Sequence, residues 1–437
     1  MGIMNARTEF GGRATAKTSS AGSVIRPATC CTVWSALLAA CASGQAQSVL
    51  VPPVEVSDRT PSMEAAAANQ VGSVGLPILR RPAEAEVYPL RWGPLQIHPH
   101  LSYQLMYGDG ILQGPSAAEK TAVQSIAPGM YFDVGRHWAV DGAVTFNEYS
   151  NPVFKDNVGY TLAVKGIVPR EDWVVNFGYT SSLTEETQVE TGTQDKQNLH
   201  LLGASATHQF HNRLSLELGV SQDIRLSKEQ SDYVTWSSIN WLNYQATAKT
   251  SVGLGGGGGY NLVDPGTDWF FEQIRGRVLW QPGKKLNVQV SGGGQFVQFQ
   301  RTEVSPEVFP LADASVSWQI FTSTILAASF NHAIENSLQV DQFVERTGVG
   351  VSLRQRFFEH FYLDIRPAFT RAVYDSSVAG ATTGREDDYV SVQVQLSAVL
   401  FKKLRSSVFY QFADNDSSAD VFTFQSNQVG LRLDYRY

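Results

Sequence analysis

Cysteine is almost absent from this sequence, and its placement narrows the possible classes of protein. The three cysteines, Cys30, Cys31 and Cys41, all lie near the N-terminus, so the rest of the chain can form no disulfide. Beyond the N-terminal region there is no run of about 18 apolar residues, which excludes a transmembrane helix. Charged residues make up 17% of the chain, below the roughly 25% that is typical of soluble domains. These scarcities exclude a disulfide-stapled fold and a helical membrane protein.

The N-terminal region has the pattern of a secretory signal. Basic residues between Arg7 and Arg26 precede a short apolar core at 33–40, and small residues then lead to Ala46. The pattern predicts a signal peptide over 1–46, cleaved after Ala46. Residues 38–41 also resemble a lipobox, which would lipidate Cys41 instead. Cleavage after Ala46 would remove four basic residues and one acidic residue, so the net charge of −7 would become −10, which excludes nucleic acid as a partner.

The remaining chain divides at about residue 90. Residues 47–90 are rich in proline and small residues and show no periodicity, so they predict a flexible periplasmic arm. Residues 91–437 show strand patterns throughout. The clearest strand is 429–437, in which apolar or aromatic residues alternate with charged ones and the last residue is Tyr437. One face of such a strand suits lipid and the other suits water, as in the closing strand of an outer-membrane barrel.

Short and long connections alternate strictly along 91–437. Eight tight connections separate pairs of strands, and nine longer polar loops join the pairs, which predicts about 18 strands, with 16 as the alternative. The predicted fold is all-β: a transmembrane, antiparallel, up-and-down β-barrel with short periplasmic turns and longer extracellular loops. The loops span only about 6–13 residues, so we expect the 47–90 arm to be the one segment able to plug the barrel.

Aromatic residues gather at both ends of the predicted strands. This pattern predicts two rings of aromatic side chains, one at each membrane interface. The residues beside the tight turns are Trp138, Trp173, Phe210, Trp280, Phe321, Phe357, Phe361, Phe401 and Tyr437. Those beside the long loops are Tyr107, Tyr149, Tyr179, Tyr233, Trp269, Phe330, Phe343, Tyr374, Tyr389, Phe412 and Phe422.

Alternation also assigns charged residues to the inside of the barrel. Such residues predict either a transverse field that favours anionic or polar solutes, or a salt-bridged lining that stabilises the wall. The candidate pore-lining residues are Arg275, Arg277, Arg346, Arg354, Asp364, Arg366, Arg432, Asp434, Arg436 and Glu217.

Other motifs carry little chemistry. His98 and His100 stand two residues apart but lack a third ligand, so the sequence predicts no metal site and no cofactor. The glycine run 255–259 lacks the lysine of a P-loop, and we expect it to give room to bulky aromatics. No sequence spacing pairs a nucleophile with a histidine, so we do not expect the protein to be an enzyme. A hydrolase with its site at the barrel rim is kept as a third hypothesis, after a diffusion pore and an export channel.

The stretch Leu90–Pro94, together with 98–101 and 107–110, resembles the entry of outer-membrane porins of the family called β-barrel porin 2. The resemblance implies an outer-membrane location and a passive pore for small polar or anionic solutes, in contact with outer-membrane lipids. Some members of the family are associated with exopolysaccharide export, which implies an alternative role as an export channel or scaffold. The transported solute and the oligomeric state stay open.

Overall fold

The computed structural model describes residues 90–112, 118–300, 304–358, 360–378, 384–401 and 403–437. The predicted signal peptide (1–46) and nearly all of the predicted arm (47–90) lie outside these residues. The strands are β1 (Leu90–Trp92), β2 (Leu95–Leu112), β3 (Ala118–Val134), β4 (Trp138–Tyr149), β5 (Asn157–Arg170), β6 (Trp173–Thr187), β7 (Gln194–His211), β8 (Leu214–Ser227), β9 (Asp232–Thr247), β10 (Thr250–Asp264), β11 (Trp269–Gly283), β12 (Leu286–Phe299), β13 (Glu307–Phe321), β14 (Thr324–Asn336), β15 (Gln342–Phe357), β16 (Phe361–Ser376), β17 (Arg385–Leu400), β18 (Leu404–Ser417) and β19 (Phe424–Arg436).

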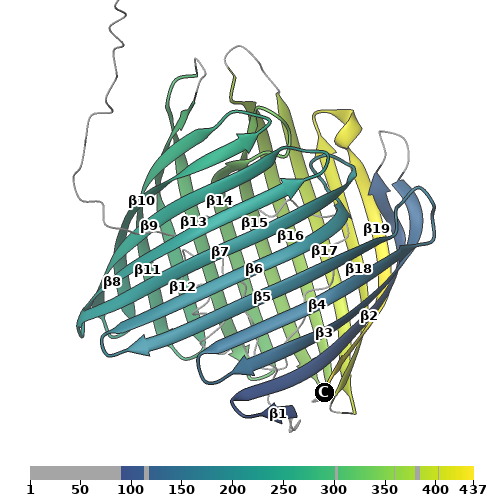
Figure 1. The fold of residues 1–437 in the computed structure, drawn as a ribbon, viewed down its shortest axis with the longest axis horizontal. Helices are drawn as coiled ribbons and strands as arrows, with labels where there is room; N and C mark the ends of the chain where they lie inside the picture. The colour runs from purple at the N-terminus through teal and green to yellow at the C-terminus, as the bar shows by residue number, and fades with distance from the viewer. Residues whose placement is uncertain (1–89, 113–117, 301–303, 359, 379–383, 402) are drawn as a thin grey trace, which may run out of the picture. The chain divides into compact units, whose positions relative to one another are not determined.

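Strands β2 to β19 form a closed antiparallel barrel (Figure 1). Each strand pairs with its neighbours in sequence, and β19 closes the barrel on β2, with Arg432 opposite Gln104. The prediction of 18 strands in an up-and-down barrel is therefore confirmed. The short strand β1 pairs only with β2 and was not predicted. A 3-10 turn, η1 (Asp420–Phe422), lies between β18 and β19, and no helix among the described residues is long and apolar enough to cross a membrane.

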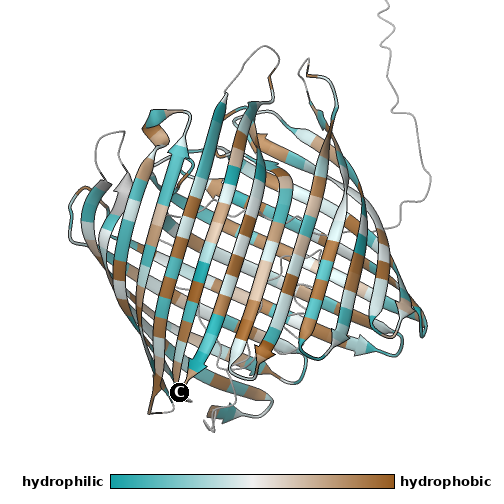
Figure 2. Ribbon diagram, turned by 180° about the vertical axis from the view of Figure 1, so that it is seen from behind, coloured by the Kyte–Doolittle hydropathy of each residue, from teal (hydrophilic) through white to brown (hydrophobic). Residues whose placement is uncertain are grey.

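The two faces of each strand differ as the alternation predicts. In β16, Phe361 and Phe369 are exposed on the outer face, whereas Tyr362 and Asp364 are buried on the inner face. Large apolar side chains stay uncovered on the outside of many strands, as at Ile274, which is 68% exposed. Colouring by hydropathy shows the alternation along the strands (Figure 2). Such an outer surface is unfavourable in water and favourable in lipid, because burying apolar area releases about 25 cal/mol per Å².

The aromatic residues at the two ends of the barrel differ in exposure, whereas the sequence predicted an exposed ring at each end. All nine predicted beside the tight turns are exposed, as an aromatic ring at the periplasmic interface requires. The extracellular ring is wrong in large part, because five of its eleven members are buried: Tyr233, Trp269, Phe343, Tyr374 and Tyr389. Only Tyr107 and Phe330 of the eleven are exposed large hydrophobic residues. The buried five pack inside the barrel mouth, where two hairpins bend inward.

The glycine run of β10 has the role that the sequence predicts. A Cβ atom on Gly255 would lie 2.7 Å from the Trp241 ring, and one on Gly259 would lie 2.5 Å from Phe271. Both contacts are shorter than atoms tolerate, so glycine is needed where these rings lie flat against the wall. Trp241 is 1% exposed and in turn supports a charged pair on the inner face.

Candidate pore wall and extracellular mouth

All ten predicted lining residues lie on the inner face of the barrel. Their strands place them there by register, since each pairs across with another inward residue, as Arg354 does with Asp364 and Arg277 with Ser291. The structure adds the partners, which the sequence did not reveal. Most of these arginines contact a carboxylate, so the inner wall carries ion pairs.

The most buried pair joins Arg277 of β11 to Glu217 of β8. The Nη2 atom of Arg277 donates to Glu217, and its Nε and Nη2 atoms donate to Asn243 Oδ1 at 3.0 and 2.8 Å. The guanidinium carbon lies 4.2 Å from the centre of the Trp241 ring. Only 3% of the Arg277 side chain is exposed. This arginine is therefore fixed on three sides and belongs to the wall as a structural element.

A polar cavity of about 420 Å³ lies against this part of the wall. Amide side chains from four strands line it, together with the Glu217–Arg277 pair: Asn176, Asn243, Gln281 and Asn287. Amides and hydroxyls both donate and accept hydrogen bonds, and burying them dry is costly. The inner surface beside β6 to β12 is therefore suited to water and not to lipid.

Two further pairs cross between neighbouring parts of the wall. Arg275 Nη1 donates to Asp313 Oδ2 at 3.0 Å, and Arg346 Nε lies 3.1 Å from Glu335 Oε2. Neither Asp313 nor Glu335 was among the predicted lining residues. Both could have been found by extending the alternation along β13 and β14, because they occupy inward positions opposite Ser291 and Val344.

Arginine outnumbers carboxylate on the inner face of β15 to β19. Asp364 Oδ1 accepts from Arg354 Nε at 3.0 Å and lies 3.5 Å from Arg366 Nη2, so two arginines share one carboxylate. Asp434 Oδ1 likewise accepts from Arg432 Nε at 2.8 Å. Arg405 is opposite Asp434 in register, and Arg436 lies two residues further along β19. We name the five arginines and two aspartates the basic sector: Arg354, Arg366, Arg405, Arg432, Arg436, Asp364 and Asp434.

The basic sector keeps part of its charge accessible. The side chains of Arg354, Arg366 and Arg432 are 21%, 20% and 15% exposed, whereas that of Arg277 is nearly covered. Among the described residues of this sector, five arginines stand beside two aspartates. The covered Arg277–Glu217 pair at β8 and β11 and the partly exposed arginines at β15 to β19 therefore lie in different parts of the wall.

The histidines of the first strand belong to the wall as well. His98 Nε2 lies 3.8 Å from Asp133 Oδ2, and His100 Nε2 lies 3.1 Å from Asp141 Oδ1. The two imidazoles therefore contact different carboxylates. In the part of the chain that the structure describes, no group of three or more side chains could hold a metal ion.

At the extracellular end, β14 separates from its wall neighbour β13, while β15 stays paired with β16 to Gln342. Pairing between β13 and β14 ends at Ala312 opposite His332, but pairing between β14 and β15 continues to Asn336 opposite Phe343. The freed tip lies over inward residues of other strands. Phe343 stacks on Phe299 with ring centres 5.1 Å apart. The hairpin therefore bends into the barrel.

Polar contacts hold this hairpin against strands β9 to β11. Trp269 Nε1 donates to Asn336 Oδ1 at 2.9 Å, and Asn336 Nδ2 donates to Asn261 Oδ1 at 3.0 Å and Thr235 Oγ1 at 3.3 Å. Asn336 thus joins β14 to β9, β10 and β11. The aromatic residues Trp269 and Phe343 are buried for this reason and do not reach the membrane interface.

The β6–β7 hairpin bends inward from another part of the barrel. Pairing between β5 and β6 ends at Tyr160 opposite Leu183, whereas β6 and β7 stay paired to Thr187 opposite Gln194. Val189 at the tip packs with Tyr389, Ala413 and Phe424, which belong to β17, β18 and β19. These strands are not neighbours of β6 or β7 in the barrel. The tip therefore crosses the lumen.

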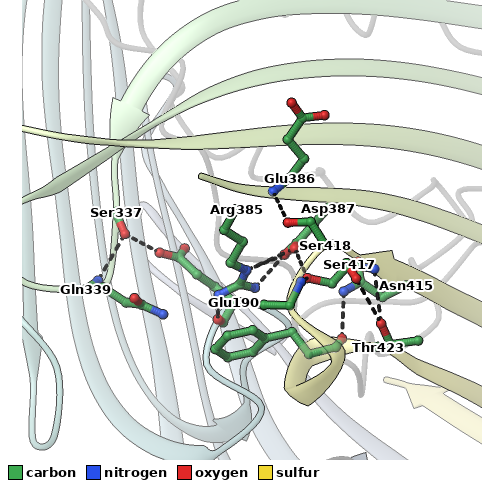
Figure 3. Close-up of polar contacts among 12 residues, drawn as sticks. Glu190, Ser337, Gln339, Arg385, Glu386, Asp387, Asn415, Ser417, Ser418 and Thr423 are labelled. Carbon is green, nitrogen blue, oxygen red and sulfur yellow. Dashed lines mark hydrogen bonds and ion pairs between the residues drawn. The ribbon is translucent and has the colours of Figure 1, made fainter. Parts of the chain in front are cut away.

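The two tips meet at Glu190 (Figure 3). The Oε1 atom of Glu190 accepts from Ser337 Oγ at 2.5 Å and from the backbone N–H of Leu338 at 2.7 Å. Its backbone carbonyl accepts from Arg385 Nη1 at 2.8 Å. Glu190, Ser337 and Leu338 are 4%, 2% and 1% exposed. We name this contact between the tips 187–193 and 337–341 the mouth latch.

Neighbouring residues support the mouth latch. Arg385 Nε donates to Asp387 Oδ1 at 2.9 Å, and its guanidinium lies over the Tyr374 and Phe422 rings. The backbone N–H of Ser231 donates to Leu338 O at 3.2 Å. The loops themselves are short, yet two of them meet across the lumen. The strands run beyond the wall, and these paired extensions give two short loops enough reach to meet across the lumen.

Comparisons with known proteins add little to this architecture. No family model and no curated protein matches the chain. Among solved structures, Pseudomonas aeruginosa OccK2 (OpdF), in complex with glucuronate, aligns with a TM-score of 0.42 and 10% identity over 78% of this chain and 97% of that chain. Acinetobacter baumannii OccAB3 gives 0.43 and 9% over 79% and 100%. The copper transporter OprC gives 0.42 and 11% over 76% and 63%.

These low scores carry no argument beyond the barrel that the strand pairing already defines. Backbone polar groups in lipid must be satisfied internally, and a closed barrel with an apolar outer face meets that condition. This chain is an outer-membrane β-barrel. The resemblance to β-barrel porin 2 proteins stays a resemblance of residues and architecture.

Proposed function

We propose that the protein is a water-filled outer-membrane pore for small polar solutes and that it favours anions. Eighteen strands enclose a lumen wide enough for an aqueous channel unless something fills it. The amide-lined cavity and the ion pairs of the inner wall support a hydrated interior. The observation that carries the anion preference is the basic sector, where five arginines face two aspartates.

Ion selectivity of the purified barrel tests this proposal. In a planar bilayer with a potassium chloride gradient, we expect the reversal potential to lie close to the equilibrium potential of chloride. A basic surface attracts anions and raises their local concentration in the channel. An absence of conductance both in the wild type and in a variant whose mouth latch is broken would contradict the pore. A reversal potential close to the equilibrium potential of potassium would contradict the anion preference.

Two roles expected from the sequence stay predictions. The association with exopolysaccharide export depends on the resemblance alone, and no contact of the described residues favours it over a diffusion pore. The expectation that the 47–90 arm plugs the barrel falls outside the described residues. Conductance measured with and without that arm tests it, because a plug would lower the conductance of the full chain.

A further inference from the structure

We infer that the two inward hairpin tips form a gate and that Glu190 keeps it closed. This inference rests on the proposed pore function and concerns its regulation. The tips come from separate hairpins, β6–β7 and β14–β15. β6 is not paired with β5 beyond Leu183, and β7 pairs with β8 only from Gln197 onward, so residues 187–193 can move without breaking the ladders that close the barrel. On the other hairpin, β15 stays paired with β16 to Gln342, which holds residues 337–341 in place.

The contact between the tips is small and depends on one carboxylate. Glu190 Oε1 accepts both hydrogen bonds that join the tips, from Ser337 and Leu338. Both hydrogen bonds are buried from water, where the loss of an acceptor leaves its donors unsatisfied at a cost. Removing the carboxylate thus frees both donors in one step. A junction with one such residue can open without unfolding the barrel.

The two tips are anchored unequally. The β14–β15 tip has an aromatic base, where Phe343 contacts Phe299 and Phe309, and Asn336 contacts three strands. The β6–β7 tip is held by Val189 in an apolar cluster, by the Arg385 contact and by the latch itself, and it has no aromatic base of this kind among the described residues. We therefore assign the moving part to residues 187–193 and the fixed part to 337–341.

Single-channel recording of Glu190→Ala tests the gate. We expect the open probability or the open conductance to rise at least about tenfold, because both hydrogen bonds to the Glu190 carboxylate are lost. Glu190→Gln keeps one acceptor oxygen and should lie between the wild type and Glu190→Ala. Glu229→Ala is the matched control. Glu229 is an exposed carboxylate in the β8–β9 loop, so its substitution removes the same charge without changing a residue of the latch.

Reversible cross-linking distinguishes a moving gate from a fixed constriction. The double variant Glu190→Cys, Ser337→Cys is treated with a short thiol-reactive cross-linker that dithiothreitol cleaves. We expect cross-linking to block the current and reduction to restore it, while each single cysteine variant shows no block.

Other results separate the two proposals. A current that neither Glu190→Ala nor the cross-link changes would overturn the gate and leave the pore intact. If wild type, Glu190→Ala and the reduced double variant all fail to conduct while the barrel is folded by circular dichroism, the pore itself is overturned.

Discussion

The Arg277–Glu217 pair offers the sharpest test of which inner charges stabilise the wall. In Arg277→Met, Glu217 loses the guanidinium while its side chain, only 11% exposed, stays mostly covered. Breaking a fully buried ion pair costs about 3–5 kcal/mol, and the slight exposure of Glu217 places the expected loss near the lower end, at about 3 kcal/mol. The double variant Arg277→Met, Glu217→Gln leaves no carboxylate behind, so we expect it to recover at least about half of that loss.

The free energy of unfolding can be measured by urea titration in lipid vesicles, with tryptophan fluorescence as the signal. Trp241 lies under the guanidinium and should report the change directly. The control is Arg371→Ala, which removes an exposed arginine paired with Glu386 and should cost less than about 1 kcal/mol. If Arg277→Met is as stable as the control, or if the double variant is no better than the single one, the assignment of this pair to the structural lining is wrong.

Three other predictions concern the basic sector, the glycine run and the hairpin base. Arg366→Ala and Arg432→Ala should each shift the reversal potential toward zero, because each removes an accessible positive charge, whereas Arg277→Met should shift it less; equal shifts would contradict the division of roles. Gly255→Val should destabilise the barrel by at least about 2 kcal/mol in the same urea assay, since its Cβ would meet Trp241 at 2.7 Å, and Gly276→Val, where a Cβ meets nothing within 4 Å, is its control. Asn336→Ala should raise the exchange rate of the Trp269 indole N–H in hydrogen exchange, and an unchanged rate would contradict the hairpin anchor.

The sequence predicted those features that depend on local periodicity. The alternation of apolar and polar residues identified the outer and inner faces of strands such as β16 correctly, because a strand has only two faces. Tight and long connections identified the strand number for a similar reason, since each hairpin needs turn-forming residues. Even the role of Gly255 beside an aromatic ring followed from the absence of side chains in a strand.

The mouth could not be predicted in the same way. Alternation states which face a residue occupies, but it does not state where a hairpin leaves the wall. Trp269 and Tyr389 were therefore assigned to a membrane interface although they lie inside the barrel. Glu190 meets Ser337 across 147 positions of sequence, and Arg277 meets Glu217 across 60. Contacts of this range depend on the closed barrel and have no local signal.

The reversal potential of single channels in a potassium chloride gradient tests the central claim most directly. The basic sector predicts a current carried mainly by chloride through the wild-type barrel, and a larger current with the same selectivity through Glu190→Ala. A folded barrel that conducts potassium in preference to chloride, or that conducts nothing even after Glu190→Ala, would contradict the account of an anion-favouring pore with a latched mouth.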